Sequence, residues 1–134
     1  MSAAEGKAAM DAHAARIAAH YDHARAKHPR FADLFYRGEK KESFKGFADY
    51  LLYKWREAVA TGIERNDLDA ISVLMCEMAE TIHAYAHGNK AAAVEECYDA
   101  IAVLLRMVDV LEGRQALGDP NAPIDEAEKE GATK

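Results

Sequence analysis

The chain has 134 residues, of which half are hydrophobic and only three are prolines. This length suits one domain with a substantial core, and the abundance of alanine favours helices. The net charge of −6 argues against a nucleic-acid polymer as partner, because affinity for such polymers depends on lysine and arginine neutralising phosphates. A nucleotide is not excluded, since bound Mg²⁺ can offset its charge. With Cys76 and Cys97 and no signal peptide, we expect reduced thiols in a cytoplasmic protein. No apolar run approaches transmembrane length, so we expect no membrane partner.

Residues 2 to 28 are rich in alanine and predict a first helix, which ends at His28 because the following proline disfavours a helical residue before it. Its thin apolar stripe consists of Met10, Ala14, Ile17, Tyr21 and Ala24. We therefore expect a peripheral or partner-facing helix. His13, His20 and His23 lie on neighbouring sides of it, and we expect them to be exposed or hydrogen-bonded rather than metal ligands.

A short helical turn is predicted from Phe31 to Arg37, where Phe31, Leu34 and Phe35 would enter the core before Gly38 breaks the turn.

The next predicted helix covers about residues 41 to 65 and has a broad apolar stripe that should face the core. The stripe comprises Phe44, Phe47, Leu51, Leu52, Trp55, Ala58, Val59 and Ile63. We expect Trp55 to pack rather than to stack on a base. Lys54 and Arg56 lie nearby and could reach phosphates. Asn66 is expected to cap the following helix, with Asp67 and Asp69 in its first turn.

Two acidic helices are predicted between Asp67 and Leu111, with Gly88 as the break and Asn89 as the cap of the second. Residues three apart share one face of a helix, so Glu77 and Glu80 project together, as do Glu96 and Asp99. A short connection makes the two helices antiparallel neighbours, which lets the four carboxylates converge. Converging carboxylates repel one another unless a cation lies among them, and Mg²⁺ prefers such oxygen ligands.

Each acidic helix also has an apolar face that we expect to form the core. In the first helix this face comprises Leu68, Ile71, Leu74, Met75, Met78, Ile82 and Tyr85, and in the second Ile101, Leu104, Leu105 and Val108. The acidic stripes lie away from these faces, among small apolar residues and without nearby lysine or arginine on the same helix. The spacing therefore fits either a partly enclosed metal site or an acidic face exposed to solvent.

A rival metal site would use the stripe Cys76, Glu80, His83 and His87. Glu80-x-x-His83 matches one element of di-iron bundles, but such sites need this element twice, and the chain contains it once. A single straight stripe also surrounds a tetrahedral ion poorly. We therefore prefer the carboxylate cluster.

The motif pair Glu77-x-x-Glu80 and Glu96-x-x-Asp99, separated by residues 81 to 95, resembles that of the MazG-type all-α nucleoside triphosphate pyrophosphohydrolases. This superfamily includes dimeric dUTPases and phosphoribosyl-ATP pyrophosphohydrolases, and the resemblance covers about residues 44 to 112. It implies that the four acids are catalytic Mg²⁺ ligands, with Mn²⁺ as an alternative ion. It also implies hydrolysis of a nucleoside triphosphate to the monophosphate and pyrophosphate, in a homodimer or homotetramer.

Two features depart from the family's pattern. Cys76 occupies a position where the family often has glutamate, and the chain after Arg114 offers only Lys129 and Lys134 in place of a basic tail. These departures keep open a second class of function, a non-catalytic helical module that binds a nucleotide or a protein.

The predicted organisation is one all-α domain of four to five helices over residues 1 to 113, with a motif core at 44 to 112. Two acidic helices cannot enclose a nucleotide alone, so we expect oligomerisation to complete the bundle. The acidic segment from 114 to 134 is expected to be disordered or loosely attached, because it shows no periodicity and its end, 125 to 134, is charged and lacks large apolar residues.

Overall fold

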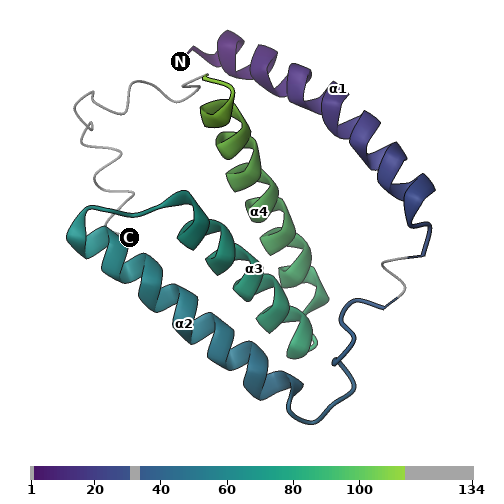
Figure 1. Cartoon of the computed structure of the whole chain (residues 1–134), viewed down its shortest axis with the longest axis vertical. Helices are drawn as coiled ribbons and strands as arrows, with labels where there is room; N and C mark the ends of the chain where they lie inside the picture. The colour runs from purple at the N-terminus through teal and green to yellow at the C-terminus, as the bar shows by residue number, and fades with distance from the viewer. Residues whose placement is uncertain (1, 31–33, 114–134) are drawn as a thin grey trace. The chain divides into compact units, whose positions relative to one another are not determined.

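The computed structural model describes residues 2–30 and 34–113, and all regular structure in these ranges is helical (Figure 1). The four helices are α1 (Ala3–Lys27), α2 (Phe44–Arg65), α3 (Ala70–Ala86) and α4 (Lys90–Leu111). This confirms the all-α prediction. The chain divides into two compact units, Met1–Phe44 and Lys45–Lys134. The segment predicted to be disordered, 114–134, lies outside the described residues. Among the described helices, none is both long and apolar enough to cross a membrane.

In the first unit, α1 begins with a capping box. The backbone N–H of Glu5 donates to the Ser2 hydroxyl (3.1 Å), and the Ser2 N–H donates to the Glu5 carboxylate (3.2 Å). The helix ends at Lys27, directly before the His28-Pro29 pair, as predicted. His20 and His23 are exposed as expected, whereas His13 is buried.

Residues 34–43 form bends and turns rather than a helix, so the short helical turn predicted before Gly38 is wrong over its described part. Leu34 and Phe35 are about half-exposed and do not enter a core. Phe31 lies outside the described residues. The buried aromatic here is Phe44, whose ring stacks on Tyr36 with 5.2 Å between ring centroids. The turn that contains Gly38 prevents the apolar residues before it from forming a helix.

The connection from α2 to α3 differs from the prediction in its cap. Asn66 does not cap α3 but ends α2 in the left-handed conformation (φ 58°), which asparagine tolerates better than most residues. Its N–H donates to the Ile63 carbonyl and that of Asp67 to the Gly62 carbonyl, which is a Schellman motif. The N-cap of α3 is Asp69, whose carboxylate accepts from the Ser72 N–H (2.9 Å).

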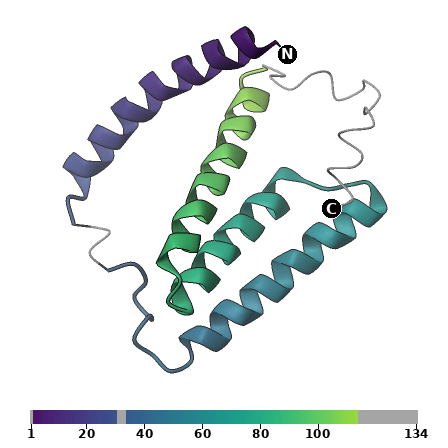
Figure 2. The same cartoon turned by 180° about the vertical axis from the view of Figure 1, so that it is seen from behind.

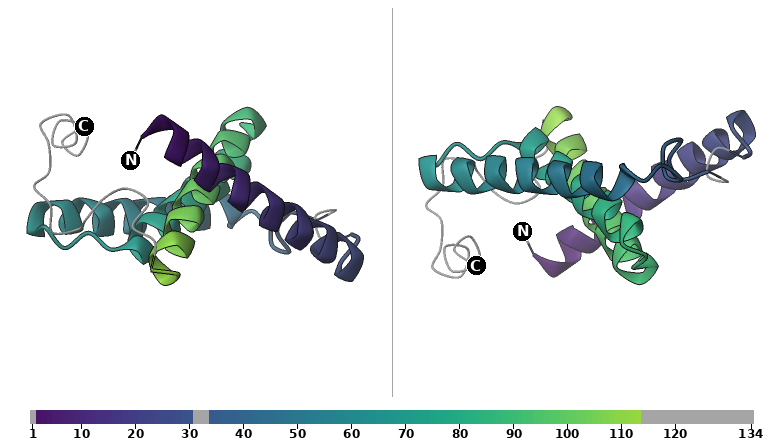
Figure 3. Two further views of the ribbon diagram at one scale, coloured as in Figure 1. Left: turned by 90° about the horizontal axis from the view of Figure 1, so that it is seen from above. Right: turned by 90° about the horizontal axis from the view of Figure 1, so that it is seen from below.

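The connection from α3 to α4 forms as predicted. Gly88 adopts a positive φ of 76°, and the Asn89 N–H donates to the Ala84 carbonyl, so a second Schellman motif ends α3. Asn89 then caps α4 by accepting from the Ala92 N–H at 3.1 Å. This tight turn makes α3 and α4 antiparallel neighbours, which lie side by side when seen from the front and from behind (Figures 1 and 2). Seen from above and below, α4 crosses the direction of α2 obliquely (Figure 3).

Most of the buried hydrophobic side chains of the second unit are small, which corrects part of the predicted core faces. The buried hydrophobic residues of α2, α3 and α4, apart from Phe44, are Ala48, Leu52, Cys76, Ala79, Ala84, Ala93 and Ala100. Several bulky residues predicted to face the core are 41% to 55% exposed: Phe47, Ile63, Leu68, Ile71, Met78, Ile101 and Leu104. Small residues allow helices to approach closely, so the alanine-lined sides pack within the chain, while these seven bulky residues remain partly exposed.

Substituting Gly88 should destabilise the turn that sets α3 against α4. Gly88→Ala should lower the free energy of unfolding by about 1 kcal/mol, because a β-carbon is unfavourable at positive φ. The matched control is Gly46→Ala inside α2, where an added β-carbon also meets nothing within 4 Å. Alanine is the better helix former there, so this variant should be as stable as the parent or more stable. Urea unfolding followed by circular dichroism measures both, and equal effects would contradict the role given to Gly88.

Candidate functional site

Three of the four predicted carboxylates converge where α3 faces α4. Glu77 of α3 and Glu96 and Asp99 of α4 each offer an oxygen, and these oxygens all lie within 4.8 Å of one another. The alanines around them allow the two helices to approach closely enough for this convergence. Glu77 and Glu96 are half-buried between the two helices, whereas Asp99 is exposed at the edge of the cluster.

The surroundings of these carboxylates leave oxygens without partners. The Oε2 atoms of Glu77 and Glu96 are buried and have no hydrogen-bond partner. Unpaired buried oxygens disfavour a negative charge, and such groups call for a proton or a cation. Hydrogen bonding to Glu80, together with burial and a hydrogen bond to Glu77, raises the pKa of Glu96 to about 8. Burial is also the main cause of the raised pKa of Glu77, and the charges of Glu80 and Asp99 add to it.

Glu80, the fourth predicted acid, lies outside this group of three ligand oxygens. Its carboxylate is 3.5 Å from the Arg56 guanidinium of α2, and it accepts a hydrogen bond from the Cys76 thiol at 3.7 Å. Through its effect on the pKa of Glu96 it is also coupled to the acidic cluster. Glu80 therefore links the three carboxylates to Arg56, a cation that comes from α2 because α3 contains no lysine or arginine.

Of the two residues predicted to reach phosphates, Arg56 lies beside the acids and Lys54 does not. Arg56 is paired with Glu80, yet its side chain remains 62% exposed and is free to turn towards a ligand. The Lys54 ammonium lies over the ring of Trp55, 5.4 Å from the ring centroid. Lys54 also lines a separate groove with Tyr50, Tyr53 and Arg65.

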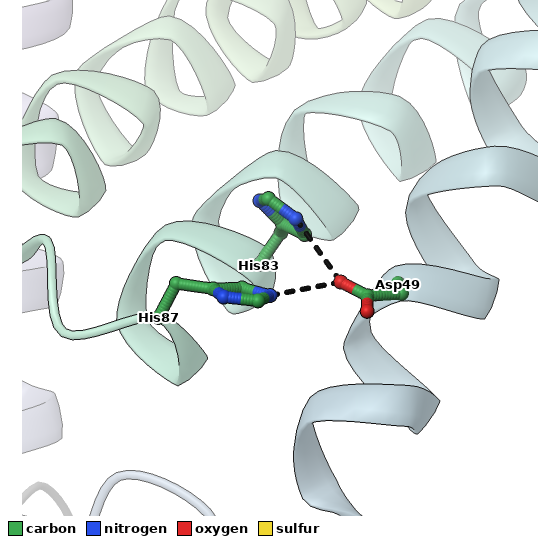
Figure 4. Close-up of side chains that lie close together, drawn as sticks. All are labelled: Asp49, His83 and His87. Atoms are coloured by element: carbon green, nitrogen blue, oxygen red, sulfur yellow. Dashed lines mark hydrogen bonds and ion pairs between the residues drawn. The ribbon is translucent and has the colours of Figure 1, made fainter.

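The rival stripe of Cys76, Glu80, His83 and His87 does not form a single cluster. Among the residues that the structure describes, two groups can each offer three ligand atoms within 4.8 Å, and neither includes Cys76 or Glu80. The second group joins His83 and His87 of α3 to Asp49 of α2, as Figure 4 shows. Hydrogen bonding to His87 is the main cause of the lowered pKa of Asp49. The spacing of the two histidines was visible in the sequence, but no signal pointed to Asp49.

The acidic cluster fits a hard divalent cation. Its donors are all carboxylate oxygens, the ligand chemistry that Mg²⁺ prefers, and two of its three residues also have a buried, unpaired oxygen. Arg56 and Glu80 at its edge provide one positive and one negative group within reach of a charged substrate.

The raised pKa of Glu96 predicts a pH-dependent stability of the metal-free protein. The folded chain holds this proton up to about pH 8, whereas an unperturbed glutamate loses it near pH 4.5, so folding should become less favourable as pH rises between these values. Glu96→Gln should flatten the decline, and Glu95→Gln, an exposed neighbour, should not. Thermal melting from pH 5 to 8 in a chelator measures this, and identical profiles for the two variants would contradict it.

The two cysteines should differ in reactivity. Burial, followed by the nearby charges of Glu80 and Glu77, raises the pKa of Cys76 to about 11, which keeps the thiol protonated at neutral pH. Cys97 is exposed. A limiting amount of iodoacetamide should therefore modify Cys97 first, as read by peptide mass spectrometry. Modification of Cys76 at an equal rate would show that this side of α3 is open to solvent.

Comparisons with known proteins add no relative on which to base a family assignment. No protein-family model matches the chain, and no curated protein and no solved structure is significantly similar to it.

Proposed function

We propose that this protein is a Mg²⁺-dependent nucleoside triphosphate pyrophosphohydrolase, which releases pyrophosphate and a nucleoside monophosphate. The observation that carries the proposal is the convergence of Glu77, Glu96 and Asp99, of which the two glutamates each have a buried, unpaired oxygen. The resemblance of the two acidic motifs to MazG-type enzymes supplies the reaction class.

In this proposal Glu77, Glu96 and Asp99 hold the ion. Bound Mg²⁺ would neutralise phosphate charge and polarise the phosphorus centre that water attacks. Before the ion binds, Glu96 carries a proton at neutral pH because its pKa is raised to about 8, and this proton must leave when the ion arrives. Mg²⁺ affinity should accordingly increase with pH up to that value.

Glu80 and Arg56 act at the edge of the cluster. Glu80 is the acid left outside the group of three, which makes it the candidate to accept a proton from the attacking water. Arg56 pairs with Glu80 in the free protein and is exposed enough to turn to a phosphate oxygen once the triphosphate binds. The chain thus has a cation next to the acids despite lacking a basic tail.

The outward-facing apolar residues support a homodimer or homotetramer as the active form. Ile71 and Met78 of α3 and Ile101 and Leu104 of α4 are each at least 42% exposed. Isolated exposed hydrophobic residues are common, but a repeated apolar face on two adjacent helices is typical of an interface. A second copy would cover these faces and border the acidic cluster.

Pyrophosphate release from a panel of canonical and modified nucleoside triphosphates tests the activity. We expect Mg²⁺-dependent turnover of at least one of them by the parent protein. Glu77→Gln should lower Mg²⁺ affinity by about tenfold or more and abolish turnover, because it removes a charged ligand. Glu80→Gln should abolish turnover but leave most of the Mg²⁺ affinity. Glu95→Gln, which changes an exposed glutamate on α4, should change neither.

No turnover with either Mg²⁺ or Mn²⁺ would contradict the catalytic proposal. The alternative is a non-catalytic helical module, for which the exposed apolar faces of α3 and α4 are the favourable observation. The two functions separate in thermal melting: an enzyme should be stabilised by Mg²⁺ with a nucleotide, and a protein-binding module should respond to neither.

A further inference from the structure

The side chains of Asp49, His83 and His87 converge on one point between α2 and α3 (Figure 4). The Nε2 atom of His87 lies 2.8 Å from Asp49 Oδ1, and the Nε2 atom of His83 lies 3.1 Å from the same oxygen. The two imidazole rings are 4.4 Å apart and tilted by 40°, so they are not stacked on each other. Each ring instead directs its own Nε2 atom towards Asp49.

We propose that Asp49, His83 and His87 bind a divalent transition-metal ion such as Zn²⁺. Two imidazoles and one carboxylate are a common donor set for such ions, and they are too rich in nitrogen to favour Mg²⁺. This site shares no ligand with the acidic cluster, and the inference does not depend on the proposed hydrolase activity.

The distances from Asp49 to the two histidines are close to those between the ligands of a metal ion. Ligand bonds of about 2.0–2.1 Å in tetrahedral directions place donor atoms roughly 3.3 Å apart. The two observed separations of 2.8 and 3.1 Å would open by no more than about half an ångström to admit the ion. Both histidines already present Nε2, a usual ligand atom, towards the carboxylate.

The ligands also approach from two helices, α2 and α3, and can therefore surround an ion better than residues along one face of a single helix. His83 and His87 lie four residues apart and project from successive turns on one face of α3, the spacing used by helical zinc-binding histidine pairs. Asp49 approaches them from α2. An ion held between these helices would cross-link them and stabilise the folded chain.

The site keeps coordination positions open. Asp49 and His83 line a groove of about 460 Å³, together with Leu52, Tyr53, Arg56 and Glu57. The side chains of Asp49, His83 and His87 are 56%, 36% and 39% exposed, so an ion can enter from solvent. With three protein ligands, at least one position remains for water or for a small anionic ligand in the groove, next to Arg56.

Titration of the chelator-treated full chain with Zn²⁺, followed by calorimetry, tests the site. We expect one ion per chain and a rise in the melting temperature. His87→Ala and Asp49→Asn should each weaken Zn²⁺ binding by about tenfold or more, because each removes a ligand. His23→Ala on α1 is the matched histidine control and should bind like the parent. Cys97→Ser, which removes the exposed thiol, and Glu96→Gln should also bind like the parent.

A spectroscopic measurement separates direct ligation from a structural effect of the substitutions. Co²⁺ added to the parent should give visible ligand-field bands of a four- or five-coordinate site, and His83→Ala should lose them while its far-ultraviolet circular dichroism stays helical. Absence of Zn²⁺ binding in the parent would overturn the inference. Parent-like affinity in His87→Ala and Asp49→Asn, or loss of binding in Glu96→Gln or Cys97→Ser instead, would also overturn it.

Discussion

The close approach of α3 and α4 is the constraint on which the rest of the candidate site depends. Gly88 turns the chain sharply, and alanines such as Ala79 and Ala93 are buried where larger side chains would hold the helices apart. This proximity forces Glu77 and Glu96 together, with one oxygen of each buried and unpaired. Carboxylates held this close together lower the stability of the metal-free chain when they are ionised, and a cation that relieves their repulsion should restore it.

Helix α2 contributes charged partners for side chains of α3. It runs antiparallel to α3, so Arg56 meets Glu80 near the middle of α3, and Asp49 meets His83 and His87 near its end. The two polar links lie along one side of α3, yet their chemistry differs. The first joins a guanidinium to an acidic cluster with only oxygen donors, and the second offers two nitrogens and an oxygen. The two sets of donor atoms therefore suit different classes of cation.

The distribution of apolar residues follows from the same packing. Small side chains fill the contacts within the chain, so the bulky faces with Ile71, Met78, Ile101 and Leu104 face outwards. A second copy that covered them would bury apolar surface, and each Å² of it would stabilise the assembly by about 25 cal/mol. It would also shield the nearby acids from solvent. Assembly and site formation are coupled in the proposed function for this reason.

The sequence by itself determined the four helices and the turn between α3 and α4, because these depend on local chemistry. The proline after His28, the left-handed glycine at 88 and the cap at Asn89 each act within a few residues. The sequence also indicated the acidic motifs, since spacing on a helix is local. Asn66 was misassigned because asparagine suits both ends of a helix.

Only the tertiary structure decided which helix faces turn inwards and which distant residues meet. Hydrophobic periodicity marks a bulky face without saying whether that face is covered by the same chain or left for another. Asp49 and Arg56 meet residues of α3 that are far from them in sequence, and no local pattern encodes such a pairing. The partners of Glu80 and His87 follow from helix packing, which depends on the whole chain.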